Sequence, residues 1–296
     1  MSAFNWLRTK GISIFAGLVI LYTLVPIVII ALFSFNDPSG KFNFTWQGFN
    51  LDHWSNAFGI PDLTDALLTS LKLAVLSTLI ATILGTMIAM ALVRYQFSGR
   101  KVSNLLIVIP MTSPEVVIGA ALLSMFVYFQ IATGFVTLLI AHVMFSISFF
   151  VVVVRSRLIS FDSRLEEAAR DLGADARTTF RTLTLPLIAP GLFGAAFLAF
   201  ALSLDDFVIS NFNSGTTVTF PLYIFGAAQR GIPVEVNVLA TMLFLVTLIA
   251  MAGTVWQQGR AAKLAAVRPD QEDDSSFGGG SPAKAPAGSP APASAS

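Results

Sequence analysis

The chain lacks cysteine entirely, and only two of its 296 residues are histidine, His53 and His142. Disulfide bonds, thiolate metal sites and a histidine-rich metal site are therefore excluded. Charged residues make up 12% of the chain, about half the ~25% that is usual in soluble domains. The spacing GxxxxGK[ST], which cradles nucleotide phosphates, is also missing, so we expect no ATP hydrolysis by this chain.

Long apolar runs dominate what is present. Hydrophobic residues reach 55% and the mean hydropathy is +0.75. Six runs are long enough to cross a bilayer as helices. They cover about 11–35, 65–93, 103–129, the stretch from Thr133–Gly134 to Val154, 187–210 and 236–256. The sequence therefore predicts an all-α integral membrane protein with six transmembrane helices in a domain over 12–256.

Basic residues predict the orientation of these spans. With both ends placed inside, all but three of the 18 Lys and Arg residues fall on the cytoplasmic side, the exceptions being Lys41, Lys72 and Arg230. Cytoplasmic loops carry such an excess of Lys and Arg. We expect a cytoplasmic N-terminus over 1–11 and a cytoplasmic tail over 257–296, which is rich in Ala, Pro, Gly and Ser and should be disordered.

Two features inside the spans predict helix packing. Small residues recur every four positions at Ala81, Gly85 and Ala89 and again at Gly191, Ala195 and Ala199, a pattern that lets helices approach closely. Pro110 and Pro114 interrupt the third span and free backbone carbonyls that lipid cannot satisfy. This span should therefore face protein or a cavity.

The one long polar interruption, 155–186, lies between the fourth and fifth spans and carries six arginines. Ser163-x-x-Glu166 has the spacing of a capping box, and the helix that follows should end at Gly173. Asp175 can cap a second helix that stops before Pro186. We predict a helix–glycine–helix element in the cytoplasm, where another protein could grip it.

This loop resembles the EAA loop of binding-protein-dependent ABC importer permeases. Glu167-Ala168-Ala169, then Gly173, then Leu183-x-Leu185-Pro186 reproduce its spacing, with leucine at 183 where isoleucine is usual. The resemblance implies a type I ABC importer permease fold in which 155–186 is the coupling loop. The residues it implies in coupling to an ATPase are Glu166, Glu167, Ala168, Ala169, Leu172, Gly173, Leu183 and Pro186. Leu165, Ala168, Ala169 and Leu172 would form an apolar contact face, with Glu166, Glu167 and Arg170 on its rim.

Further motifs resemble the polyamine subgroup of these permeases, for spermidine and putrescine. They are Asn36 after Phe33-Ser34-Phe35, Trp46-x-Gly48-Phe49, Ser70-Leu71, Pro114-Glu115-Val116-Val117-x-Gly119, Ser203-Leu204-Asp205-Asp206-Phe207 and Pro233-x-Glu235-Val236-Asn237. Thr69 and Phe220 depart from the subgroup, which usually has asparagine and leucine there.

Three carboxylates are candidates for the substrate path: Asp205, Asp206 and Glu115. Acidic groups in a span are costly and should face a watery path, where they could replace the water that each ammonium group of a polyamine loses. The two aspartates lie 100° apart on a helix, so both cannot point into one pore; one can instead pair with a neighbouring helix or cap a kink. A solvated helix end, or for Glu115 a packing role beside the proline, remains the alternative.

Taken together, the sequence predicts a permease subunit of an ATP-driven importer in the bacterial cytoplasmic membrane, not an enzyme. The resemblance implies a second permease chain, two ATPase subunits that use ATP and Mg, and an extracytoplasmic solute-binding protein, with no cofactor or metal on this chain and no nucleic acid. A permease for another cationic or small polar solute, such as an amino acid or opine, stays open. An ion-coupled secondary transporter would leave the capped loop without a role, and a membrane enzyme lacks any catalytic constellation. His142 is expected to be a hydrogen-bonded packing residue.

Overall fold

The computed structural model describes residues 3–160, 162 and 164–266, and the side chains of 10–160, 162, 164–249 and 251–253. In this part of the chain the regular structure is helical, with one isolated bridge between Asn36 and Phe49. The helices, in chain order, are α1 (Ala3–Phe33), α2 (Asp52–Ser55), α3 (Pro61–Arg94), α4 (Arg100–Thr112), α5 (Glu115–Tyr128), α6 (Phe135–Ser160), α7 (Arg164–Asp171), α8 (Ala176–Thr179), the π-helical turn η1 (Phe180–Thr184), α9 (Leu185–Asp205), α10 (Val208–Asn213), α11 (Phe220–Arg230) and α12 (Val234–Ala266).

Five stretches of the described residues are long and apolar enough to cross a membrane: Lys10–Phe33, Pro61–Arg94, Phe135–Ser160, Ala176–Asp205 and Val234–Gly253. The third predicted span is not one straight helix. It is split into α4 and α5, which meet at 113°, because Pro114 takes an extended conformation (ψ 134°) that no helix continues through. Counting the bent pair as one span gives six.

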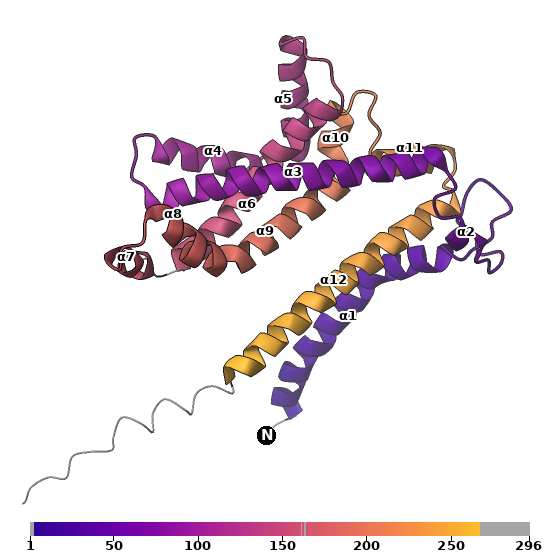
Figure 1. The fold of residues 1–296 in the computed structure, drawn as a ribbon. Helices are drawn as coiled ribbons and strands as arrows, with labels where there is room; N and C mark the ends of the chain where they lie inside the picture. The colour runs from indigo at the N-terminus through magenta and orange to yellow at the C-terminus, as the bar shows by residue number, and fades with distance from the viewer. Residues whose placement is uncertain (1–2, 161, 163, 267–296) are drawn as a thin grey trace, which may run out of the picture. The chain divides into compact units, whose positions relative to one another are not determined.

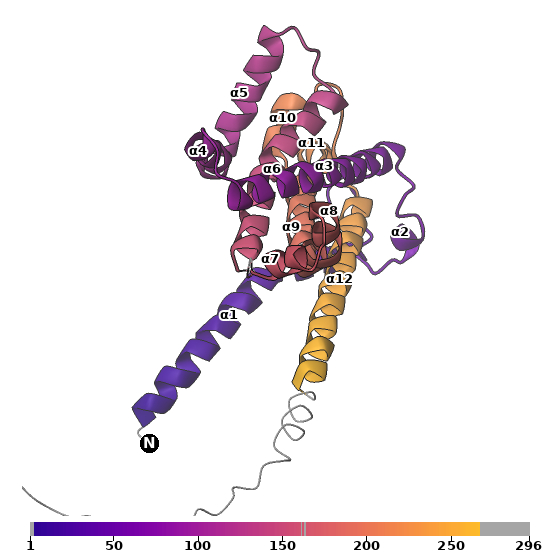
Figure 2. The same cartoon turned by 60° about the vertical axis from the view of Figure 1, so that its left-hand side comes forward.

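The core of the first compact unit, Met1–Thr241, is built on α3, α6 and α9, which pack against one another and lie side by side in Figures 1 and 2. The predicted small-residue stripes form these contacts. Ala81, Gly85 and Ala89 are buried on α3, and a Cβ on Gly85 would meet the ring of Phe150 of α6. Phe150 thus packs directly on the α3 backbone at Gly85, beside a buried cluster that includes Leu92, Val154 and Ile188.

The ends of two predicted elements differ from the structure. α9 stops at Asp205, before the predicted end at 210, and the chain restarts as α10. α12 continues to Ala266, so residues 257–266 are helical and not part of an irregular tail, as the good helix formers there allow. Ser163 and residues 267–296 lie outside the described residues, so the full capping box and the disordered tail stay predictions.

Figure 1 shows α7 and α8 at one end of α3 and α11 at the other. Hydrogen bonds agree with this arrangement. The Phe220 amide of α11 donates to Ser70 Oγ in the first half of α3 at 2.8 Å, whereas Arg94, the last residue of α3, contacts Glu166 of α7. The polar loop and the segments around α2 and α11 therefore lie at opposite ends of the bundle.

Candidate functional site

α7, the first helix of the predicted coupling loop, ends in a glycine turn as predicted. The Ala174 amide donates to the Ala169 carbonyl at 3.0 Å and the Gly173 amide donates to the Arg170 carbonyl at 2.9 Å, the two bonds of a Schellman motif. Gly173 has φ +87°, a conformation that is unfavourable for any residue with a Cβ atom. No atom lies within 4 Å of where that Cβ would be, so backbone conformation, and not space, requires glycine here.

Glu166 does not lie on the rim of this helix, and that prediction is wrong. Its side chain is 11% exposed, and its Oε1 accepts from Arg94 Nη2 at 3.0 Å and from Thr184 Oγ1 at 2.8 Å. Arg94 ends α3 and Thr184 belongs to η1. Glu166 therefore ties α7 to two other elements. Local sequence patterns do not predict this role, because Arg94 lies 72 residues away along the chain.

The opposite face of α7 has no partner among the described residues. Leu172 is 90% exposed and Leu165 is 48% exposed. The remaining residues predicted for coupling vary in exposure: Glu167, Ala168, Gly173 and Pro186 are exposed, and Ala169 and Leu183 are half-buried. An apolar strip that faces outward on a helix fixed from behind is suited to contact another protein.

Asp175 caps α8 as predicted, because its carboxylate accepts from the Thr178 amide at 2.9 Å. This hydrogen bond lowers the pKa of Asp175 below its ordinary value of 3.8. The second helix, however, does not stop before Pro186. The Leu185 amide donates to the Phe180 carbonyl five residues back, and the wider π-turn carries the chain into α9 with helical angles.

At the other end of α9, Asp206 holds the break before α10. Its carboxylate accepts from the amides of Ile209 (3.2 Å) and Ser210 (2.8 Å) and from Ser210 Oγ (2.9 Å). His142 Nε2 of α6 lies 3.4 Å from Asp206 Oδ2, and both side chains are 5% exposed or less. Asp206 thus caps a kink and pairs with a neighbouring helix at once, while Asp205 is exposed.

His142 is hydrogen-bonded on both ring nitrogens, to Ser203 Oγ at 2.8 Å and to Ser210 Oγ at 3.0 Å, which confirms it as a buried, satisfied residue. Glu115 begins α5 directly after the bend and is exposed. In the part of the chain that the structure describes, no hydrogen bond or ion pair joins Glu115 to either aspartate. The three predicted path carboxylates therefore do not form one cluster within this chain.

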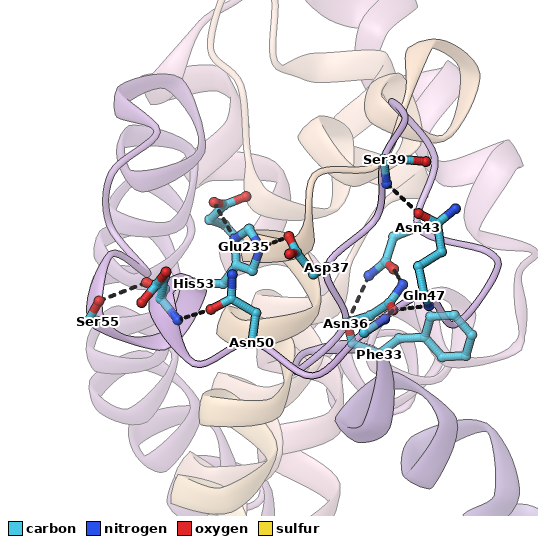
Figure 3. Close-up of polar contacts among 12 residues, drawn as sticks. Phe33, Asn36, Asp37, Ser39, Asn43, Gln47, Asn50, His53, Ser55 and Glu235 are labelled. Carbon is cyan, nitrogen blue, oxygen red and sulfur yellow. Dashed lines mark hydrogen bonds and ion pairs between the residues drawn. The ribbon is translucent and has the colours of Figure 1, made fainter.

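The segment before α2 is organised by a buried asparagine (Figure 3). Asn36 Nδ2 donates to Asn43 Oδ1 at 2.6 Å and to the Thr45 carbonyl at 2.8 Å, and its Oδ1 accepts from the Gln47 amide at 2.7 Å. The ring of Phe35 stacks with Phe49 and with Trp54. The loop after α1 is thus a folded surface and not a loose connection.

The same loop is joined to the first turn of α12. Figure 3 shows His53 between Glu235 and Asp37; His53 Nδ1 lies 3.1 Å from Glu235 Oε1, and Nε2 lies 4.0 Å from Asp37 Oδ1. The link brings together the segments that begin at Asn36 and Pro233, although they lie far apart in the sequence.

A cavity of about 710 Å³ opens between the start of α3 and α11. Asp62 and Asp65 line it from α3, and Tyr223 and Arg230 line it from α11. Burial, followed by the negative charge of Asp62, raises the pKa of Tyr223. None of the three predicted path carboxylates lines this cavity.

Sequence reasoning missed the partners that fix these sites. Arg94 and Thr184 hold Glu166, and Ser77, Ser203 and Ser210 surround His142 and Asp206. Arg94 stood out only as one of three basic residues in a short turn. Single buried serines in apolar helices give no sequence signal of their own, because serine is common at helix contacts in membranes.

Comparison with known proteins bears on the class. Residues 81–263 match the family described as binding-protein-dependent transport system inner membrane component. The chain belongs to this family. The spermidine/putrescine transport system permease protein PotC of Haemophilus influenzae is 38% identical over 235 residues, which cover 79% of this chain and 91% of that protein. PotC of Escherichia coli K12 is 39% identical over 77% of this chain and 86% of its own length.

A second kind of relative is the putrescine transport system permease protein PotI of Escherichia coli K12, 36% identical over 77% of this chain and 82% of that protein. Among solved structures, a bacterial ABC transporter involved in alginate import has a TM-score of 0.64 at 16% identity and covers 87% of this chain and 98% of its own. The MetNI methionine transporter has a TM-score of 0.55 at 18% identity, covering 67% and 95%. This inner-membrane component therefore has the type I ABC importer permease fold.

Proposed function

We propose that this chain is the transmembrane permease subunit of an ATP-driven importer for polyamines, spermidine or putrescine. The observation that carries the proposal is the coupling loop, whose α7 is fixed from behind by Glu166 and shows an apolar strip to the outside. The substrate class is supported by the three permease relatives named above, all of which carry polyamine names.

In this proposal α7 docks on a separate ATPase dimer, which binds ATP and Mg. Leu165 and Leu172, with Ala168 between them, supply apolar contact area, and Glu167 and Arg170 supply polar pairing at the edge. Glu166 acts differently from its neighbours, because it holds the helix to α3 and η1. Gly173, Leu183 and Pro186 shape the return of the chain into α9.

The proposed solute path includes the end of α9, where Asp205 is exposed in a helix that is otherwise apolar, and the bend before Glu115. An exposed carboxylate in such a place can offset the loss of water around an ammonium group. Asp206 serves the path indirectly, by fixing the α9–α10 break.

The further partners in the proposal are a second, homologous permease chain and an extracytoplasmic solute-binding protein. One solved neighbour is an alginate transporter in complex with a periplasmic protein, which supports the second of these. The folded loop around Asn36 and the segment 211–235 offer a preformed surface for it. The proposal includes cytoplasmic termini, which the distribution of Lys and Arg supports.

Uptake of labelled putrescine and spermidine into right-side-out vesicles that contain the assembled complex, with ATP enclosed and the binding protein added outside, tests the proposal. We expect uptake that requires ATP and the binding protein, and loss of ATPase association with Leu172→Asp. Burial of a leucine is worth about 1.5–3 kcal/mol, so binding should weaken at least roughly tenfold. Asp171→Asn on the same helix serves as the control. Transport by this chain alone, without nucleotide or partner, would disprove the proposal.

A further inference from the structure

A row of buried hydrogen bonds crosses the helix bundle at His142. Ser77 Oγ of α3 donates to Ser203 Oγ of α9 at 3.0 Å, and Ser203 Oγ lies 2.8 Å from His142 Nδ1. On the other side of the ring, Nε2 lies 3.0 Å from Ser210 Oγ of α10. His142 is 2% exposed, so α3, α6, α9 and α10 are joined by polar groups that water does not reach.

The acceptor at the end of the row fixes the direction of the hydrogen bonds. Ser210 Oγ donates to Asp206 Oδ2 at 2.9 Å, because an ionised carboxylate can only accept. The hydroxyl oxygen of Ser210 must then accept the Nε2–H of His142, and Nδ1 is free to accept the hydroxyl of Ser203, whose oxygen already accepts from Ser77. The hydrogen bonds of Ser210 therefore place a proton on Nε2 of His142.

The row ends on the residue that shapes the break after α9. Asp206 Oδ1 accepts from the Ile209 amide, and its Oδ2 accepts from the amide and the hydroxyl of Ser210. The ring of His142 also lies beside Oδ2. A carboxylate with these donors is already compensated and has little to gain from a solute cation. Asp205 is exposed, and among the described residues no side-chain hydrogen bond or ion pair occupies it.

We propose that His142 is a positioning residue for solute recognition: by holding Asp206 at the α9–α10 break, it presents Asp205 as the carboxylate of this pair that meets the cationic solute. The inference rests on the proposed function. It divides the two adjacent aspartates into one that fixes the backbone and one that contacts the ammonium group.

Uptake of labelled putrescine by the complete complex in vesicles tests this role with three variants of α6. His142→Leu removes both hydrogen bonds and should lower uptake about tenfold, the usual cost of a hydrogen bond that serves a charged group. His142→Gln can still donate toward Ser210 and should keep uptake within about threefold of wild type on the same basis. Ser146→Ala is the matched control, because Ser146 lies one turn further on, is 1% exposed and makes no hydrogen bond in the described structure; its uptake should equal wild type.

A double-mutant cycle with Asp205→Asn separates positioning from mere packing. If His142 acts through Asp205, His142→Leu should add less than about a twofold loss of uptake in the Asp205→Asn background, compared at equal amounts of assembled complex. Should His142→Leu prevent assembly, Ser210→Ala removes only the hydroxyl between ring and carboxylate and should show the same dependence on Asp205.

The positioning role would be overturned if His142→Leu lowered uptake equally in both backgrounds, or if His142→Gln lowered it as much as His142→Leu. Polyamine uptake by the wild-type complex would still support the proposed function. Absence of polyamine uptake by the wild-type complex would instead reject the proposed function, and the assignment of Asp205 with it.

Discussion

Removing the carboxylate of Glu166 should loosen α7 from the rest of the chain. In Glu166→Ala the hydrogen bonds from Arg94 (3.0 Å) and Thr184 (2.8 Å) are both lost. Breaking one side of a fully buried pair costs about 3–5 kcal/mol. Here Arg94 and Glu166 are 18% and 11% exposed, so water replaces part of the interaction, and about 2–3 kcal/mol is expected.

Hydrogen exchange of the α7 amides measures this energy directly, because local opening exposes them. A loss of about 2–3 kcal/mol should speed their exchange roughly 30- to 150-fold, while amides in the middle of α3 and α6 keep their rates. Glu166→Gln, which retains one acceptor oxygen, should show a smaller effect. Asp171→Asn changes an exposed acid on the same helix and should show none. Exchange in Glu166→Ala as slow as in this control would refute the tether.

Three further outcomes are expected. Gly173→Ala should destabilise the end of α7 by about 1–2 kcal/mol through its positive φ, whereas Gly194→Ala in α9, with open space and no positive φ, should not; hydrogen exchange compares them. The cap at Asp175 should stabilise α8 fully at neutral pH, because folding lowers the pKa of its carboxylate. The stabilisation should be lost only as the pH falls through a value below 3.8. Protection of the Thr178 amide from exchange, compared with Asp175→Ala, measures it. Gly85→Val should lower the thermal stability by about 1–3 kcal/mol, because its Cβ meets Phe150; unchanged melting would contradict the close packing of α3 on α6.

Local sequence patterns predicted what depends on neighbours along the chain. The apolar runs located the spans, Gly173 marked the end of α7, Asp175 marked the cap of α8, and the Ala81–Gly85–Ala89 stripe marked a helix contact. Each of these follows from helix periodicity or terminal hydrogen bonding, which a stretch of a few residues contains in full.

The remaining features depend on contacts between distant residues. Glu166 reads as a surface acid until Arg94 is brought to it by the α3–α7 arrangement. Pro110 and Pro114 predict an interruption but not its 113° angle. Pro186 predicts the end of a helix, whereas the π-turn η1 carries the helix through. The split of Asp205 from Asp206 could not be assigned either, because it depends on a histidine more than sixty residues earlier in the chain.

The π-turn at Phe180–Thr184 has a mechanical consequence. Because η1 joins α8 to α9 without a break in helical angles, no flexible joint separates α8 from α9. α9 has 21 residues, so it is a rod roughly 30 Å long, and a tilt of about 5° at its inner end would carry Asp205 sideways by about 3 Å on that length. A movement of α8 would therefore be passed along α9 as a displacement of Asp205.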